Sequence, residues 1–217
     1  MPHLGKKTAL IILGDVGFNF HMNMKDKVRK EKASLFETYI YCVRGNHEQR
    51  PSKMPFMVEE YDERVGNFVW FEEEYPYIRY FQDGEIYNIN DYKTLVLGGA
   101  YSIDKEFRLA LGWPWFPGEQ LNQLERDYIQ EQVKGKKFDL ILSHTCPISF
   151  CPTELFLKSI DQTKIDKTYT GLYFNTSDLN IYFNHKVIDD LEFLVGILPT
   201  LNEGEGLLYY EKEEIFS

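Results

Sequence analysis

The chain has 217 residues, 43% of them hydrophobic and 16% aromatic, and this composition excludes intrinsic disorder and favours one packed domain over residues 1–217. Acidic residues outnumber basic residues by 34 to 24, and the formal net charge of −10 argues against generic binding to duplex nucleic acid. No apolar segment is long enough to span a membrane, no secretory signal is visible, and the three cysteines fit no zinc-binding spacing, so we expect a cytoplasmic protein.

The N-terminal part of the chain predicts a strand, a helix and a second strand. The apolar run 8–13 is too short for a helix and is typical of a strand buried on both faces. A Lys-rich stretch at 24–35 has a helical composition, and the β-rich run 39–43 predicts another strand. This order indicates a β-α-β unit with a parallel pair of strands.

The middle of the chain predicts several short strands and one helix. Turn signals at Asp83-Gly84 and Asn90-Asp91 separate apolar runs and favour antiparallel hairpins. The expected strands are 77–80, 85–89, 92–97, 138–142, 181–183 and 206–210, and the expected helix is 119–133. The mixture predicts a layered α/β fold with two sheets and helices outside them.

Polar residues follow three of these predicted strands. They are Asp15 after Gly14, the run Gly-Asn-His-Glu at 45–48, and His144 after Ser143. Ligands collect at the carboxyl ends of strands in open α/β sheets, so these residues are expected to converge. A carboxylate, an amide and imidazoles suit Mn, Fe or Zn. One such residue alone is more often a turn residue or a helix N-cap, but three together weaken that alternative.

The segments around these residues resemble the calcineurin-like metallophosphoesterases. Residues 10–17 (LIILGDVG) and 43–48 (VRGNHE) are similar to the second and third motifs of that family. Residues 97–104 (LGGAYSID) and 142–147 (LSHTCP) resemble later blocks of its small bacterial and phage branch. The Gly-Asn-His-Glu run is the most specific element. The resemblance implies a four-layer α/β/β/α sandwich with a two-metal site that hydrolyses phosphate mono- or diesters.

The resemblance also implies roles for individual residues. Asp15 corresponds to the carboxylate that bridges both metals, and Asn46 and His144 correspond to ligands of the second metal. His47 corresponds to the histidine that protonates the leaving oxygen or steadies the phosphoryl group, as a general acid near neutral pH can. Two metals would polarise the phosphorus and neutralise charge on its oxygens.

Two departures from the family pattern affect the first metal. Residues 1–7 contain no counterpart of the family's opening Asp-x-His motif, and His3 is a poor replacement, so the first strand and helix of the sandwich are expected to be missing. In the closing Gly-His-x-His motif, His185 aligns with the first histidine and Val187 with the second, although His185 could equally be an ordinary surface residue.

These departures predict a site for one metal rather than two. Its ligands would be Asp15, Asn46, His144 and His185, its ion Mn, Fe or Zn, and hydrolysis would be weak. A rival from a different class is a degenerate or truncated relative that binds a metal, a nucleotide or a protein without turnover.

The residues that would contact the substrate are less well defined. Arg44 and Arg108 are candidate phosphate contacts because a guanidinium group fits phosphate oxygens, but a salt bridge explains each of them equally well. The aromatic loop 113–117 either walls a substrate pocket or covers the edge of the core, and we favour the second. The substrate itself stays open among phosphorylated small molecules, nucleotides and phosphoproteins, and so does the oligomeric state.

Overall fold

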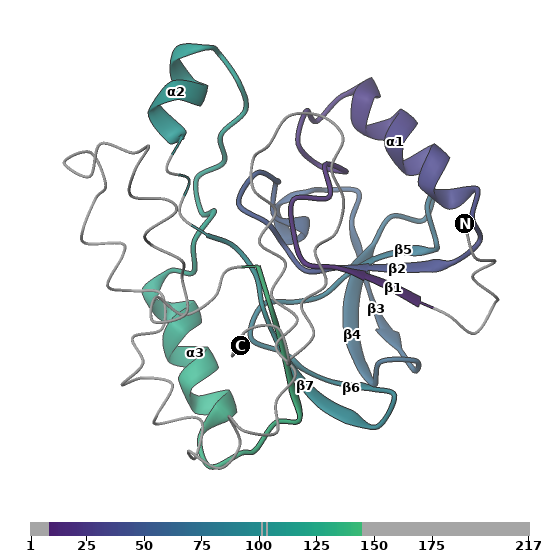
Figure 1. The fold of residues 1–217 in the computed structure, drawn as a ribbon, viewed down its shortest axis with the longest axis vertical. Coiled ribbons are helices and arrows are strands. Elements are labelled where there is room, and N and C mark those ends of the chain that lie inside the picture. Colours follow the sequence, from purple (N-terminus) through teal and green to yellow (C-terminus); the bar gives the residue numbers. More distant parts are fainter. Residues whose placement is uncertain (1–8, 101, 103, 145–217) are drawn as a thin grey trace, which may run out of the picture.

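A computed structural model describes residues 9–100, 102 and 104–144 of the chain (Figure 1). Within them the chain forms two mixed sheets accompanied by helices. The elements in chain order are β1 (Ala9–Ile12), α1 (Met24–Ser34), β2 (Tyr39–Cys42), the short 3-10 helix η1 (Pro51–Lys53), β3 (Val58–Asp62), β4 (Asn67–Phe71), β5 (Ile78–Tyr80), β6 (Ile86–Ile89), β7 (Tyr92–Leu97), α2 (Lys105–Ala110), α3 (Gln123–Val133) and β8 (Leu140–Ser143).

The larger sheet has the strand order β1-β2-β5-β4-β3, and the smaller sheet has the order β6-β7-β8. Strands β1 and β2 are parallel, with Ala9 opposite Tyr39 and Ile12 opposite Cys42, and helix α1 connects them. The predicted β-α-β unit is therefore confirmed. In the smaller sheet β7 pairs with β6 in antiparallel and with β8 in parallel orientation.

Only one of the two predicted hairpins exists. The turn at Asn90-Asp91 joins β6 to β7, and both turn residues adopt positive φ angles, as such a tight hairpin turn requires. The hairpin predicted at Asp83-Gly84 is wrong, because β5 pairs with β2 and β4 in the larger sheet whereas β6 begins the smaller one. The Gly84 N–H donates to the carbonyl of Val96, so this turn leads the chain from one sheet to the other.

The antiparallel pair β3 and β4 was not predicted. Strand β3 has the sequence VEEYD and exposes four of its five residues, so it lacks the apolar alternation that marks a half-buried strand. Helix α3 begins four residues later than predicted. Its N-cap is Asn122, whose side chain accepts from the N–H of Glu125 while the Glu125 carboxylate accepts from the N–H of Asn122.

Three hydrophobic clusters form the core. Successive side chains of a strand point to opposite faces of its sheet, so neighbouring residues of one strand belong to different clusters. In β7, Leu95 and Leu97 pack with Ile129 and Val133 of α3 in one cluster. The intervening Val96 belongs to a second cluster that draws on strands of both sheets and whose buried members are Tyr41, Val43, Val65, Val69, Phe81, Tyr87, Val96 and Leu142.

The third cluster contains Ile40 and Cys42 of β2, whereas Tyr41 between them faces the second cluster. Ala33 of α1 packs against this third cluster, and Figure 1 shows α1 beside β1, β2 and β5 and α3 beside β7. Each sheet thus has one face toward the shared cluster and its other face toward a cluster that includes a helix residue.

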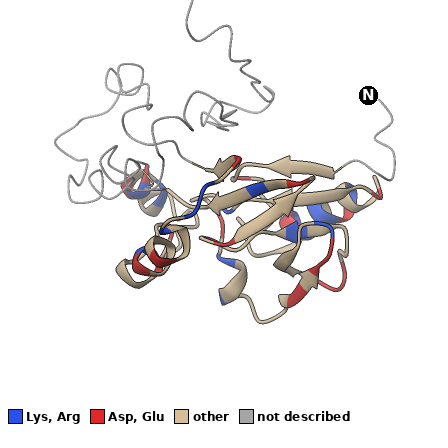
Figure 2. Cartoon of the chain, turned by 90° about the horizontal axis from the view of Figure 1, so that it is seen from below, with Lys and Arg blue, Asp and Glu red and all other residues tan. Residues whose placement is uncertain are grey.

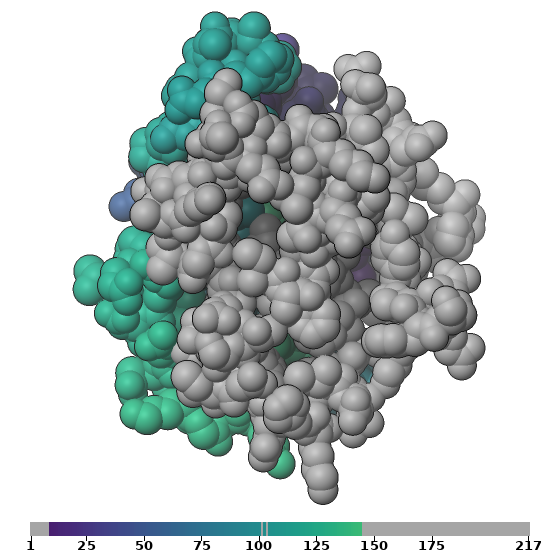
Figure 3. Space-filling model, turned by 60° about the vertical axis from the view of Figure 1, so that its left-hand side comes forward, coloured from purple at the N-terminus to yellow at the C-terminus, as the bar shows by residue number. Residues whose placement is uncertain are grey.

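The surface of the described part mixes charges of both signs. Figure 2 shows acidic and basic residues interspersed over helices and strands rather than gathered in one basic patch. Segments around α2 and α3 reach the surface in Figure 3. Phe107 of α2 and Leu124 of α3 are both exposed. No helix among residues 9–144 combines the length and apolar character needed to cross a membrane. The strands predicted at 181–183 and 206–210 lie outside the described residues.

Candidate metal centre

The loop after β1 places Asp15 at the carboxyl edge of the larger sheet. Asp15 has a φ of 51°, in the left-handed region. That conformation costs a residue other than glycine roughly 1 kcal/mol or more and is retained mostly at functional sites. The Asp15 carboxylate accepts a hydrogen bond from the backbone N–H of His47 at 3.1 Å, so the loops after β1 and β2 are joined directly.

Two glycines explain why the Gly-Asp and Gly-Asn pairs occur in this sequence. A Cβ atom on Gly14 would lie 2.1 Å from Nδ1 of His144, and Gly14 also has a φ of +97°. A Cβ atom on Gly45 would lie 2.0 Å from Oδ1 of Asp15. Only glycine permits these approaches, so both residues let three distant segments of the chain meet.

Asp15, Asn46 and His144 converge at this meeting point. Nε2 of His144 lies 2.8 Å from Oδ1 of Asn46 and 3.6 Å from Oδ2 of Asp15. Nδ1 of the same ring lies 2.7 Å from the carbonyl oxygen of Leu13, which can only accept. Nδ1 therefore carries the ring hydrogen of the neutral imidazole, and the lone pair of Nε2 points toward the two side-chain oxygens.

The amide of Asn46 is held in one orientation by a buried network. Its Nδ2 donates to Oγ of Ser102 at 2.8 Å. The Ser102 hydroxyl donates to Oε2 of Glu119 at 2.6 Å, and Nη1 of Arg108 donates to the same Oγ at 3.1 Å. With its hydrogen committed to a carboxylate, Ser102 can only accept from Asn46. Oδ1 of Asn46 consequently faces His144.

These three donor atoms fit a divalent cation. A carboxylate oxygen, an amide oxygen and an imidazole nitrogen face one another with no hydrogen between them while His144 is neutral. Such lone pairs repel unless a proton or a metal ion lies among them, and the mixed oxygen and nitrogen set suits a first-row divalent ion. Among the described residues no group of three or more His, Cys, Asp or Glu side chains stands ready to hold a metal, so the amide of Asn46 is essential to this set.

His47 lies at the edge of the same site. Its ring stacks on Phe20 with centroids 6.2 Å apart, and its Nε2 lies 3.7 Å from Oδ1 of Asp104. Burial acts to raise the pKa of Asp104, but the interaction with His47 and the charge of Arg108 outweigh burial and lower it. Asp104 is therefore an anion that lies 3.7 Å from Nε2 of His47, close enough for its charge to act on the imidazole.

Glu48 connects the loop after β2 to the loop after β1. Its buried carboxylate accepts from the N–H of Gly17 at 2.6 Å. Burial and the negative charge of Asp15 raise the pKa of Glu48 to about 7, and backbone N–H groups, among them that of Gly17, oppose this rise.

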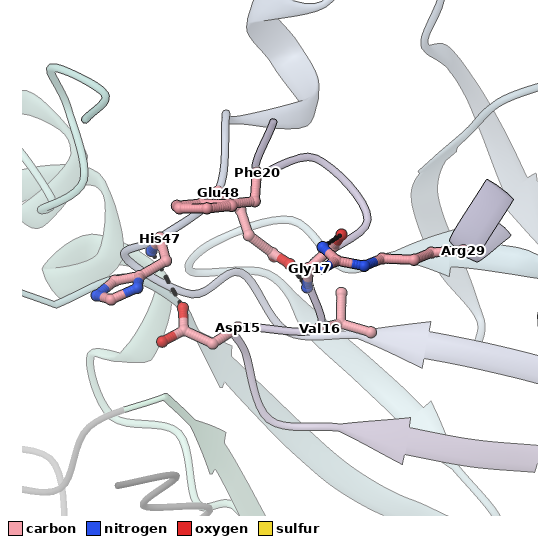
Figure 4. Close-up of a pocket in the computed structure, with 7 residues that line it drawn as sticks. All are labelled: Asp15, Val16, Gly17, Phe20, Arg29, His47 and Glu48. Carbon is pink, nitrogen blue, oxygen red and sulfur yellow. Dashed lines mark hydrogen bonds between the residues drawn. The ribbon is translucent and has the colours of Figure 1, made fainter. Parts of the chain in front are cut away.

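A pocket of about 590 Å³ opens beside these loops (Figure 4). Its lining residues are Asp15, Val16, Gly17, Phe20, Arg29, His47 and Glu48. Asp15, the candidate metal-binding carboxylate, and His47, the candidate general acid, thus line one solvent-accessible pocket, which a small phosphoester can enter.

The model of the calcineurin-like phosphoesterase family matches residues 2–194. The chain belongs to this family. The resemblance inferred from the sequence motifs is thereby confirmed, and with it a phosphoesterase family whose members typically bind divalent metals. Among curated proteins and solved structures, none matches the chain significantly.

The calcineurin-like chain buries both arginines that were expected to contact phosphate. Arg44 donates to Oδ2 of Asp83 at 2.7 Å and to the carbonyl oxygen of Glu119 at 2.7 Å. Arg108, only 1% exposed, donates to Ser102 and to the carbonyl of Pro114. Neither lines the pocket beside Asp15. These contacts are internal, and phosphate binding by either arginine stays a prediction.

Four residues that belong to the site or line its pocket were not predicted from the sequence of this calcineurin-like chain. Ser102 and Glu119 were not assigned to the site, although Ser102 lies in the LGGAYSID segment, because only the fold brings them to Asn46. Trp115 of the aromatic loop donates to Glu119 at 2.8 Å and so supports this network. Arg29 of α1 lines the pocket without any motif around it. His185 lies outside the described residues.

Proposed function

We propose that the protein is a metal-dependent phosphoesterase that holds one divalent ion, Mn, Fe or Zn, between Asp15, Asn46 and His144. His185 is the proposed fourth ligand. The observation that carries the proposal is the convergence of Oδ2 of Asp15, Oδ1 of Asn46 and Nε2 of His144 beside an open pocket. An amide whose orientation is fixed by three further side chains is typical of a ligand rather than of a turn residue.

The residues of the pocket wall then divide the remaining chemistry. An ion bound at the site would polarise the phosphoryl group and offset the charge that builds on its oxygens. His47, which lies beside Asp104 and is stacked on Phe20, donates a proton to the leaving oxygen. Phe20 also restricts water on that side of the site, because its ring forms part of the wall.

The fold supports this proposal. We propose that the three hydrophobic clusters separate the four layers of an α/β/β/α sandwich that forms one domain. The cluster shared by both sheets would be its centre, with α1 outside the larger sheet and α3 outside the smaller one. In this arrangement the proposed metal ligands follow the carboxyl ends of β1, β2 and β8, where ligands of such sheets gather.

A module that binds a metal, a nucleotide or a protein without turnover is the second candidate. It is favoured by the observation that the described residues contain no group of three or more His, Cys, Asp or Glu side chains that could hold a metal ion. With one ion in place of two, stabilisation of the transition state falls by several kcal/mol, on the order of the contribution of one Lewis acid.

Elemental analysis tests the metal proposal directly. The protein is incubated with excess manganese and desalted, and we expect about one equivalent of metal per folded chain. His144→Ala should lose the metal, whereas His21→Ala, which removes an imidazole outside the cluster, should retain it. Equal stoichiometry in both variants would contradict the site.

Hydrolysis of an aryl phosphate separates the two candidates. The proposed enzyme should release phosphate slowly with manganese, stop in excess chelator, and lose activity by about a hundredfold or more in His47→Ala, as removal of a general acid does. A folded protein that binds one equivalent of metal and gives the same background rate with and without His47 would establish the binding module instead.

A further inference from the structure

The pocket extends beyond the proposed metal ligands to a cationic side chain of helix α1. Among the residues that line it, Arg29 is the only arginine or lysine, whereas Asp15 and Glu48 are acidic. Figure 4 shows Asp15 and His47 on one side of the pocket and Arg29 reaching in from the other, with Gly17 near its guanidinium group. The two sides therefore differ in charge and in chemistry.

The guanidinium group of Arg29 is held in position without a hydrogen bond to a carboxylate. Nη1 donates to the carbonyl oxygen of Gly17 at 3.0 Å, which fixes the end of the side chain. Within the described part of the chain its one neighbouring carboxylate oxygen is Oδ1 of Asp26, 3.9 Å away, which is too far for a hydrogen bond. The side chain is 47% exposed, so donors remain available to a ligand in the pocket.

The wall between the two sides is partly apolar. Phe20 and Val16 both line the pocket, and the Phe20 ring stacks on His47. A ligand that reaches from the metal ligands to Arg29 would therefore pass an aromatic face and a methyl-bearing side chain. The order of polar, apolar and polar surfaces along the pocket matches a molecule with a short carbon framework between two charged ends.

We propose that Arg29 binds a second phosphate group of the substrate, so that the preferred substrate is a small molecule phosphorylated at both ends. This inference rests on the proposed phosphoesterase function. One phosphoester is cleaved beside Asp15 and His47, and the other phosphate pairs with the planar guanidinium group, which matches phosphate oxygens. In a chain of net charge −10, an anionic tail next to Asp15 and Glu48 needs this cation to enter the pocket.

The test compares matched substrates that differ only in the second phosphate. Alkanediol bisphosphates of increasing chain length are compared with the alkanediol monophosphates of the same length, and kcat/KM is measured by phosphate release. We expect the best bisphosphate to exceed its monophosphate by about tenfold or more, the effect of one charge-assisted contact. In Arg29→Gln this ratio should fall to about one, because the pair is lost.

A matched control separates this role from a general charge effect. Lys32→Gln removes one positive charge from an exposed position of the same helix and should keep the tenfold preference. Arg29 also supports the loop through Gly17, but damage to the loop lowers both rates and cancels in the ratio. An unchanged ratio in Arg29→Gln, or no preference for any bisphosphate in the natural protein, would overturn the proposal.

Equilibrium binding keeps the inference testable if hydrolysis is absent. Calorimetry in the presence of manganese compares non-hydrolysable alkane bisphosphonates with the matching monophosphonates. We expect the natural protein to bind the bisphosphonate about tenfold more tightly and Arg29→Gln to lose this difference. Failure of hydrolysis together with this binding pattern would reject the enzyme but retain the Arg29 site, whereas equal binding of both compounds would reject the Arg29 site alone.

Discussion

At the scale of single residues, the hydroxyl of Ser102 decides which atom Asn46 presents to His144 at the proposed metal centre. An amide has an oxygen and a nitrogen of similar size, and nothing in its shape selects one over the other. Ser102 selects because its hydrogen is used by Glu119, which leaves only acceptor capacity toward Nδ2 of Asn46. Arg108 donates to the same oxygen and so occupies its remaining lone pair.

Ser102→Ala should therefore weaken metal binding without removing a ligand. The amide of Asn46 loses its acceptor and can turn, and loss of such a supporting contact typically weakens metal affinity by about 10–100-fold. Calorimetric titration with manganese measures the change, and Ser52→Ala, at an exposed position in η1, is the matched control. If Ser102→Ala binds manganese as tightly as the natural protein, the amide is held by something other than this network.

At the scale of elements, the sequence predicted those helices and strands that form because of their own residues and the turns beside them. Strand β1, helix α1 and strand β2 follow the apolar runs and turn residues expected of a β-α-β unit. The β3 strand was missed because its edge position leaves most of its side chains exposed, so no apolar pattern marks it. The hairpin predicted at Gly84 was wrong because a turn residue indicates only that the chain changes direction. It does not indicate which sheet the next strand joins.

The capping box of α3 gives a quantitative test at this scale. Asn122→Ala removes the acceptor for the N–H of Glu125 and should lower the free energy of unfolding by about 1 kcal/mol. Urea denaturation followed by circular dichroism measures this change. Gln130→Ala, at an exposed position within the same helix, should change it by less than about 0.5 kcal/mol. Equal effects of the two substitutions would show that the cap contributes nothing measurable.

The candidate site was predictable only in part. Asp15, Asn46 and His144 follow strands and carry metal-binding atoms, so motif order and strand ends together identify them. Ser102 lies in a segment that resembles a block of the family and Arg29 in a helix without a motif, but the role of each depends on which segments the two sheets bring together. Positions that act through packing of distant segments leave no periodic signal in one sequence.

At the scale of the whole molecule, the proposed ion connects segments that only the folded chain brings together. Its ligands come from loops far apart in the sequence, and an unfolded chain has no comparable site. Manganese at about a hundredfold excess over its dissociation constant should therefore stabilise the folded state by about 2.7 kcal/mol. Thermal denaturation should show a higher midpoint with manganese and its reversal by chelator.

His144→Ala provides the control for this shift. The variant lacks the ligand that comes from the smaller sheet, so its midpoint should not respond to manganese or to chelator. His21→Ala should respond like the natural protein. A manganese-dependent shift of the same size in His144→Ala would locate the stabilising ion elsewhere in the chain.

The position of His144 has one more consequence. Asp15 and Asn46 follow β1 and β2 of the larger sheet, whereas His144 follows β8 of the smaller sheet, so the three donor atoms face each other only when the two sheets are seated on their shared cluster. The affinity for the proposed ion therefore depends on how closely the two sheets pack against each other. Val96 is buried between the sheets, so Val96→Ala would loosen their packing and should lower the affinity of the proposed metal site. A loss of the proposed activity could then originate in the interior of the protein as well as in its pocket.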